Sequence, residues 1–347
     1  MSGRKKGARI AIIVIAAAFV LILIFAAVIY GVTRVRQDTT AAYVNGAPIS
    51  AGEIKLRITA LKADAISYFD QEYGVKADSE FWERDFDGKT PSEYLRKLAL
   101  SDAARAKLEQ QLAEQYGLIS DISFSALRSE MNSVNIDNGS KIKQGLPVLG
   151  QKSYTLSTYY EYYFSNLRLS LQKRMSESDG PLYADNERLK SYYEQQKDEY
   201  YRKADTCLFY VLTADSADGL SDAAELILTG KIDEASADYP YISIETVRLD
   251  DGNSPDYSKR NGELYARMSG LENGEGTDVF TCERGQCVIC CVKREFGGYK
   301  PFTDVYSALM AQYRADKYEE YIDSLANKYQ PSSEPALYKI PINGELE

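Results

Sequence analysis

The chain has 347 residues, with 41 Lys and Arg against 51 Asp and Glu, and this net charge of −10 argues against nucleic acid as a partner. Apolar residues make up 44% of the chain, so the composition excludes wholesale disorder. The chain has no histidine, which excludes a Ser-His-Asp triad, a Cys-His dyad and any histidine-ligated metal site.

An uncharged apolar segment runs from Ile10 to Tyr30. As a helix, its 21 residues would span roughly 30 Å, enough to cross a bilayer once. This length favours an uncleaved signal anchor at 10–31 over a removable signal peptide, whose apolar part has about 7–15 residues. The first 36 residues hold six basic residues and no acid, and four of the six precede the apolar segment. We therefore expect residues 1–9 in the cytoplasm and the body of the protein outside the cell membrane.

A short extended segment opens the body of the protein. The residues AYVNGAPIS predict an extended stretch with a turn at Asn45-Gly46 and a stop at Pro48. Ser50 followed by Glu53 is typical of a capping box, so the first helix is expected to begin there.

Four more helices are predicted before Lys203. The clearest start is Thr90-Pro91-Ser92-Glu93, which combines an N-cap, a proline in the first turn and an acid at the third helical position. A short helix is expected at 123–131, followed by a loop through Gly150, and another helix at 186–202. The remaining, long helix carries an apolar stripe with spacings of 3 and 4, formed by Tyr160, Phe164, Leu167, Leu171 and Met175.

The pattern changes after Lys203 to that of a small mixed α/β unit. Its expected elements are strands at 206–212 and 241–249, a helix at 222–228, and two strands within 279–293 around a tight turn at Glu283-Arg284-Gly285. A last helix is expected at 302–328. A Pro/Ser-containing tail without periodicity follows it.

One stretch of the α/β unit carries a recognisable motif. The sequence LENGEGTDVFTCERGQCVI matches the parvulin pattern L-x-x-G-E-x-S-D-x-V followed by G-Y-H-I-I. The matching positions are Leu271, Gly274, Glu275, Asp278 and Gly285, with Thr277 in place of the usual serine. Together with the order of span, VNGxPIS segment, helices and closing helix, residues 43–330 resemble the SurA/PrsA group of extracytoplasmic foldases, which contain a parvulin-type (PpiC-type) prolyl isomerase domain.

The resemblance implies an α+β fold that follows a single N-terminal transmembrane helix. The expected parts are a helical SurA-N-like chaperone module at 43–200, a parvulin-like domain at 203–298, a C-terminal helix at 299–330 that packs back on the helical module, and a tail at 331–347.

The sequence departs from the parvulin pattern at the polar positions of the cleft. Parvulin domains have two histidines that face each other across the sheet. The second of these positions holds Cys287 here, and the first holds Thr206 or Phe209, of which the spacing to Gly230 favours Phe209. Where active members have Gly-Gly-Asp-Leu-Gly, this chain has LDDGNSPDY. Isomerisation needs only a grip on proline and stabilisation of the twisted amide, so weak activity without histidine stays open. We expect no efficient catalysis, and no imidazolium is present to activate Cys287 as a nucleophile.

Peptide binding is expected at Phe209, Phe280, Cys287, Tyr159 and Tyr163. The tyrosines belong to a cluster on the long helix of the chaperone module. Such a cluster either forms an amphipathic platform for unfolded polypeptide or lines the helical core, and the sequence leaves both interpretations open.

The five cysteines allow three interpretations. Four are clustered at Cys282, Cys287, Cys290 and Cys291, but side chains alternate along a strand, so these four thiols cannot converge on zinc without a break in the strand. A Cys282–Cys287 disulfide suits an extracytoplasmic protein. Otherwise the cysteines serve as small buried hydrophobic residues.

The sequence predicts a membrane-anchored extracytoplasmic chaperone. Its expected partners are unfolded or newly secreted polypeptides and, through 10–31, the lipid bilayer, with no nucleic acid, metal or small-molecule cofactor. Two alternatives remain: an active peptidyl-prolyl isomerase with an atypical cleft, and an envelope scaffold that holds one folded partner.

Overall fold

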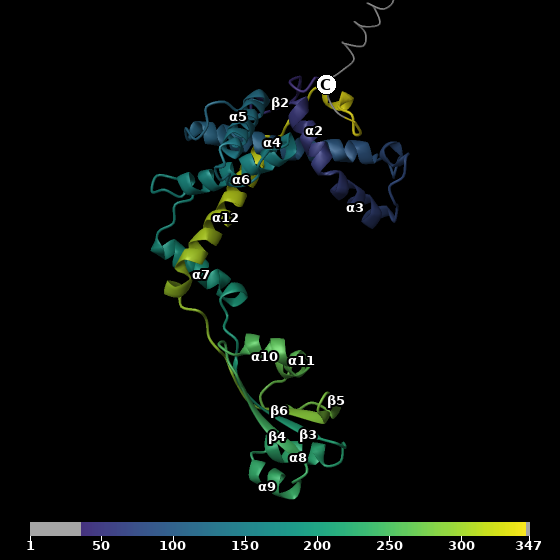
Figure 1. Ribbon diagram of the computed structural model, residues 1–347, viewed down its shortest axis with the longest axis vertical. Helices are drawn as coiled ribbons and strands as arrows, with labels where there is room; N and C mark the ends of the chain where they lie inside the picture. The colour runs from purple at the N-terminus through teal and green to yellow at the C-terminus, as the bar shows by residue number, and fades with distance from the viewer. Residues whose placement is uncertain (1–35, 345–347) are drawn as a thin grey trace, which may run out of the picture. The chain divides into compact units, whose positions relative to one another are not determined.

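A computed structural model describes residues 36–344 of the chain (Figure 1). Within these residues it contains eleven α-helices and two small antiparallel sheets, which confirms the α+β class. The predicted membrane span at 10–31 lies outside the described residues. Among the helices that are described, none has both the length and the apolar character needed to cross a bilayer. The described residues form two compact units, unit 1 (36–183 with 314–344) and unit 2 (184–313).

Unit 1 contains a small sheet with strand order β2-β1-β7. Its strands are β1 (Thr40–Val44), β2 (Ala47–Ser50) and β7 (Ser332–Ser333). The predicted turn between β1 and β2 is confirmed, because Asn45 and Gly46 both have positive φ, at 47° and 80°. Pro48 does not stop the segment, as the sequence predicted, but lies inside β2. This strand is at the sheet edge, where a missing N–H is tolerated.

The helices of unit 1 follow the predicted start signals. They are α2 (Ala51–Ala60), α3 (Lys62–Tyr73), α4 (Pro91–Gln115), α5 (Phe124–Lys143), α6 (Leu156–Met175) and the last part of α12 (Phe302–Lys328), with two short 3-10 helices, Phe81–Glu83 and Leu337–Lys339. Ser50 and Glu53 form the expected capping box of α2. The Thr90 side chain accepts from the backbone N–H of Glu93, which confirms the predicted start of α4. The prediction missed the break at Leu61 that separates α2 from α3.

Helix α5 is longer than the sequence predicted, because it continues to Lys143 instead of ending near Met131. Two asparagines in the segment expected to be a loop bond to the chain that precedes α6. The Asn135 amide bonds both the N–H and the C=O of Tyr154, and the Asn138 amide donates to the C=O of Gln151. These contacts satisfy polar side chains that, in isolation, favour a loop.

The core of unit 1 is built from the predicted apolar stripes and from one segment that was not predicted. All five stripe residues of α6 are buried. Buried side chains of Leu337, Ile340 and Ile342 join the core formed by β1, β2, α2 and α4. These three residues lie in the segment expected to be a tail without periodicity, and β7 of the same segment pairs with β1.

Unit 2 contains a four-stranded antiparallel sheet with order β4-β3-β6-β5. Its elements are α7 (Asn186–Tyr200), β3 (Thr206–Ala214), α8 (Leu220–Leu228), α9 (Ile232–Asp238), β4 (Ser243–Leu249), α10 (Ser254–Arg260), α11 (Gly262–Ser269), β5 (Phe280–Cys282), β6 (Gly285–Glu295) and the first part of α12 (Phe302–Lys328). Helix α11 packs on one face of the sheet and α8 and α9 on the other (Figure 1). The strands and α12 follow the prediction, whereas α9, α10 and α11 were not predicted.

The sheet register decides which predicted residues of unit 2 face each other. Cys287 on β6 pairs with Thr213 on β3, and Phe209 pairs with Cys291. A register irregularity occurs between Leu208 and Phe209. The resemblance implied that the two histidine positions face each other. Phe209 and Cys287 are not cross-strand partners, so this expectation was wrong for that pair.

Candidate functional site

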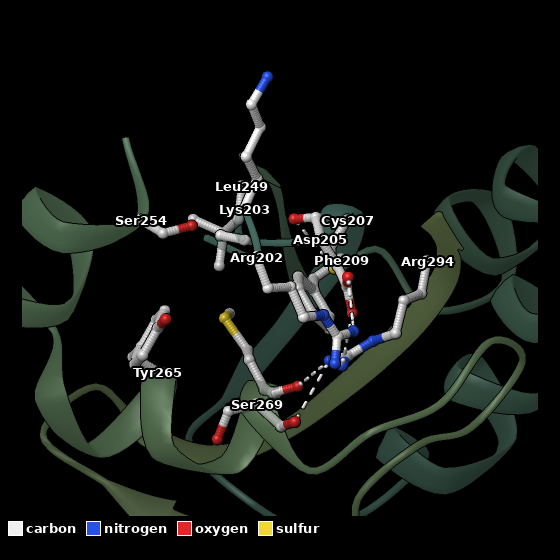
Figure 2. A pocket seen from close by; sticks show the side chains of 12 residues that line it. Arg202, Lys203, Asp205, Cys207, Phe209, Leu249, Ser254, Tyr265, Ser269 and Arg294 are labelled. Atoms are coloured by element: carbon white, nitrogen blue, oxygen red, sulfur yellow. Dashed lines mark hydrogen bonds and ion pairs between the residues drawn. The ribbon is translucent and has the colours of Figure 1, made fainter. Parts of the chain in front are cut away.

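A cleft of about 280 Å³ lies in unit 2, where the start of β3 meets α10 and α11 (Figure 2). Its apolar floor is formed by Cys207, Phe209, Leu249 and Met268. Its polar residues include Arg202, Asp205, Ser254, Tyr265 and Arg294. The cleft therefore combines an apolar surface with groups that can form hydrogen bonds.

The floor of the cleft is part of the core on the α11 face of the sheet. Phe209 is only 1% exposed, and Met268 on α11 is fully buried. Both belong to the cluster that also contains Val211 and Ile289. The strands and α11 thus hold the floor in a fixed shape, because each of these side chains is packed on several sides.

The two arginines of the cleft are held by neighbouring groups. Arg294 Nη2 donates to the backbone oxygens of Met268 and Ser269 at 3.0 and 3.4 Å, at the end of α11 (Figure 2). Arg202 Nη2 donates to Asp205 Oδ1 at 3.1 Å, and Arg294 Nη1 lies 3.6 Å from the same carboxylate. Arg294 therefore fastens α11 to β6, and Asp205 compensates much of the positive charge.

No thiol of unit 2 is prepared for nucleophilic attack. Burial raises the pKa of Cys207 and Cys291, and it raises the pKa of Cys290 to about 12. At neutral pH these three side chains are neutral, and a neutral thiol is a poor nucleophile. Cys287, at the family's histidine position, is fully buried and bonded to Cys282.

The five cysteines comprise one bonded pair and three free thiols. A disulfide joins Cys282 to Cys287 across the β5–β6 hairpin. Cys291 packs on the α11 face of the sheet and Cys290 on the α8 face, as strand alternation predicts. Within residues 36–344, no group of three or more His, Cys, Asp or Glu side chains is arranged to hold a metal ion.

The residues expected to bind peptide are divided between the two units. Phe209 lies in the cleft, whereas Phe280 packs beside it in the same core, with the Arg267 guanidinium 3.9 Å above its ring. Tyr159 is buried in the core of unit 1, and Tyr163 is partly buried against the same core. Tyr159 therefore serves the packing role that the sequence left open.

Sequence reasoning missed most of the cleft's polar residues. Tyr265 and Ser269 lie on α11 together with Met268 of the floor, and the sequence did not predict this helix because Gly262 and Gly270 border a short charged segment. The spacing of four between Leu264 and Met268, both buried, was the available signal.

No family model matches the chain. It is 26% identical over 146 residues, 41% of its length, to the chaperone for lacto-N-biosidase of Bifidobacterium longum, and the match spans about half (51%) of that relative.

Two solved structures illustrate the structural similarity. One structure comes from work on PEB4 and Cj1289, two SurA-like chaperones of Campylobacter jejuni. The match has 15% sequence identity and a TM-score of 0.30, and it covers 85% of this chain and 99% of the other chain. The other is the foldase protein PrsA of Lactococcus lactis, with 12% identity, coverage of 87% and 97%, and a TM-score of 0.23. Both structural matches are distant, and the curated relative, also distant, is described as a chaperone.

Proposed function

We propose that this protein is a membrane-anchored extracytoplasmic chaperone that binds unfolded or newly secreted polypeptides and does not isomerise prolyl bonds efficiently. The apolar segment 10–31 supports the anchor, and the basic residues before it support an extracytoplasmic body. The similarity to chaperones and foldases supports polypeptide as the ligand.

The observation that carries the proposal is the cleft over Phe209. Its volume of about 280 Å³ is close to the lower limit of about 300 Å³ for small-molecule sites. A space of this size suits one or two side chains of an extended peptide. The apolar floor would accept an apolar side chain, while Ser254 and Tyr265 can bond to the peptide backbone.

The chemistry of the cleft supports binding without efficient turnover. An isomerase must stabilise the twisted amide more strongly than the planar one. The two guanidinium groups in the cleft, those of Arg202 and Arg294, are already engaged by Asp205 and by the end of α11. Cys287 and Thr213 form a cross-strand pair that does not line the cleft. An active isomerase with an atypical cleft is therefore the less favoured alternative.

The experiment is a pair of assays on the full chain in detergent. A proline-peptide isomerisation assay should show no turnover above background, while the protein should delay aggregation of unfolded polypeptides. Tyr265→Ala should weaken this effect, because it removes a wall and a hydroxyl of the cleft. Tyr241→Ala, an exposed tyrosine of unit 2 outside the cleft, is the matched control and should behave as the wild type. Robust turnover, or equal loss in both variants, would contradict the proposal.

A dedicated chaperone is the second candidate. The Bifidobacterium longum relative is described as a chaperone for one enzyme, lacto-N-biosidase. By analogy, this chain would serve one secreted client, which is close to the scaffold alternative. Aggregation assays with several unrelated unfolded proteins separate the two candidates. Protection of all of these proteins supports a general chaperone. Protection of one native partner and of no other protein supports a dedicated chaperone.

A further inference from the structure

The C-terminal end of α5 and the loop after it present apolar side chains that nothing in unit 1 covers. This segment, residues 141–152, is called the α5 tip below. Ile142, Leu146 and Leu149 are exposed, and Leu149 reaches 95% exposure, the highest of any large apolar side chain in residues 36–344. Gly145 and Gly150, both with positive φ, form the turns on either side of Leu146 and Leu149. The α5 tip therefore holds apolar groups outward on a short, turned loop.

The α5 tip is basic in an otherwise acidic protein. It carries Lys141, Lys143 and Lys152, and the whole stretch 138–160 contains no Asp or Glu. Lys141 pairs with Asp137 at 2.7 Å, whereas Lys143 and Lys152 are exposed. Exposed apolar side chains flanked by lysines complement a surface that is anionic outside and apolar beneath, which describes a membrane with acidic lipids.

The contact between Arg128 and Asp38 and the short segment before Asp38 limit how far the α5 tip can lie from the predicted membrane span. Arg128 on α5 donates to both carboxylate oxygens of Asp38 at 2.9 Å. Asp38 follows Tyr30 by eight residues, which can extend over at most about 28 Å. From Arg128 to Lys141 the helix advances about 20 Å. These lengths allow the α5 tip to reach the headgroups when α5 lies along the bilayer surface.

From these observations we infer that the α5 tip docks on the anionic lipid surface into which the chain is anchored. Leu146 and Leu149 enter the interfacial region, and the three lysines contact lipid phosphates. This inference rests on the proposed membrane anchor. Docking would orient unit 1 on the membrane, so that newly translocated chains meet a fixed face of the protein.

The test places tryptophan probes in the full chain, reconstituted in nanodiscs that contain brominated lipid. The chain has one tryptophan, so Trp82→Phe provides the background. Leu149→Trp reports on the α5 tip. Leu169→Trp, on α6 and 64% exposed, is the matched control. We expect several-fold stronger quenching at position 149 than at position 169 in discs with phosphatidylglycerol, and loss of the difference in pure phosphatidylcholine or when the three lysines are changed to Gln.

The outcomes separate this inference from the anchor. If the chain is retained in the discs but position 149 is quenched no more than position 169, docking is refuted and the anchor stands. If the chain is not retained, both are refuted. If added unfolded polypeptide shields position 149 while lipid does not quench it, the α5 tip is a client site and the lipid assignment is wrong. A Trp82→Phe chain with native circular dichroism verifies that the background folds.

Discussion

The two units differ in what they bury. Among the described residues, unit 1 contains six of the seven buried polar or charged residues, namely Glu53, Ser92, Lys107, Glu109, Gln110 and Asn138. Unit 2 contains one, Ser254. In place of charges, the sheet of unit 2 buries thiols and aliphatic side chains.

The buried charges of unit 1 connect helices that are distant in sequence. Lys107 on α4 lies 2.6 Å from Glu53 Oε1 on α2 and also donates to the C=O of Ile122. Glu109 accepts from Arg168 on α6 at 2.9 Å and from the Tyr318 hydroxyl on α12 at 3.0 Å. Another packing of these helices would have to satisfy the same buried groups, so we infer that the paired charges help to select the helix packing of unit 1. In unit 2, the packing depends instead on the register of the strands.

The largest expected effect tests the buried pair of unit 1. Lys107→Met leaves the Glu53 carboxylate buried without its cation, so we expect the free energy of unfolding to fall by about 3–5 kcal/mol. Urea denaturation followed by circular dichroism measures it. Lys143→Met, at an exposed site, should change stability by less than about 0.5 kcal/mol. Equal effects in the two variants would show that the pair does not hold unit 1.

Alkaline pH should weaken unit 1. Burial raises the pKa of Tyr160, and burial together with Glu109 raises that of Tyr318, above the ordinary value of 10.0. Above pH 10 the unfolded chain loses these protons while the native state keeps them. The stabilising contribution is therefore complete below pH 10 and falls above it, by up to about 1.4 kcal/mol per pH unit for each tyrosine. Thermal unfolding between pH 9 and 11 measures the slope, and a flat profile would contradict the assignment.

The disulfide should matter for unit 2 and leave unit 1 unaffected. Replacing both Cys282 and Cys287 by Ala should destabilise unit 2 by about 2 kcal/mol, because the unfolded hairpin loses its cross-link. Hydrogen exchange of β5 and β6 reports this change, with exchange in α4 as the internal reference. Mass measurement gives an independent check: alkylation of the unfolded, unreduced chain should modify three cysteines, and five after reduction.

The smallest expected effect concerns a single hydroxyl. Tyr318→Phe removes one hydrogen bond to Glu109, which keeps its two bonds to Arg168. We therefore expect a loss of about 1 kcal/mol and a shallower alkaline slope. Tyr338→Phe, at an exposed tyrosine, should leave both quantities unchanged. A loss as large as that of Lys107→Met would mean that Glu109 depends on Tyr318 more than on Arg168.

Several parts of the fold were predictable because their signals are local. The cap at Thr90, the Asn45-Gly46 turn and the α6 stripe each depend on residues within a few positions of one another. The alternation of Cys290 and Cys291 follows from strand geometry alone.

The candidate site was predictable only in part. Phe209 was expected at a cleft and lies in one, but its partners on α10 and α11 come from a charged segment with two glycines. The expected proximity of Phe209 and Cys287 depended on a register in which the two are cross-strand partners, whereas Phe209 pairs with Cys291 and Cys287 pairs with Thr213. Strand pairing over this sequence distance leaves no mark in the local pattern.

By itself, the sequence determined the absence of imidazole chemistry, the acidic charge, and those helices and strands that have clear caps or periodicity, because composition, caps and periodicity act within one or two turns of chain. Tertiary structure alone decided the length of α5, the burial of Leu337, Ile340 and Ile342, and the cross-strand partner of Cys287. Each of these depends on contacts between residues far apart in the chain, whose energies exceed local preference only after the core has formed.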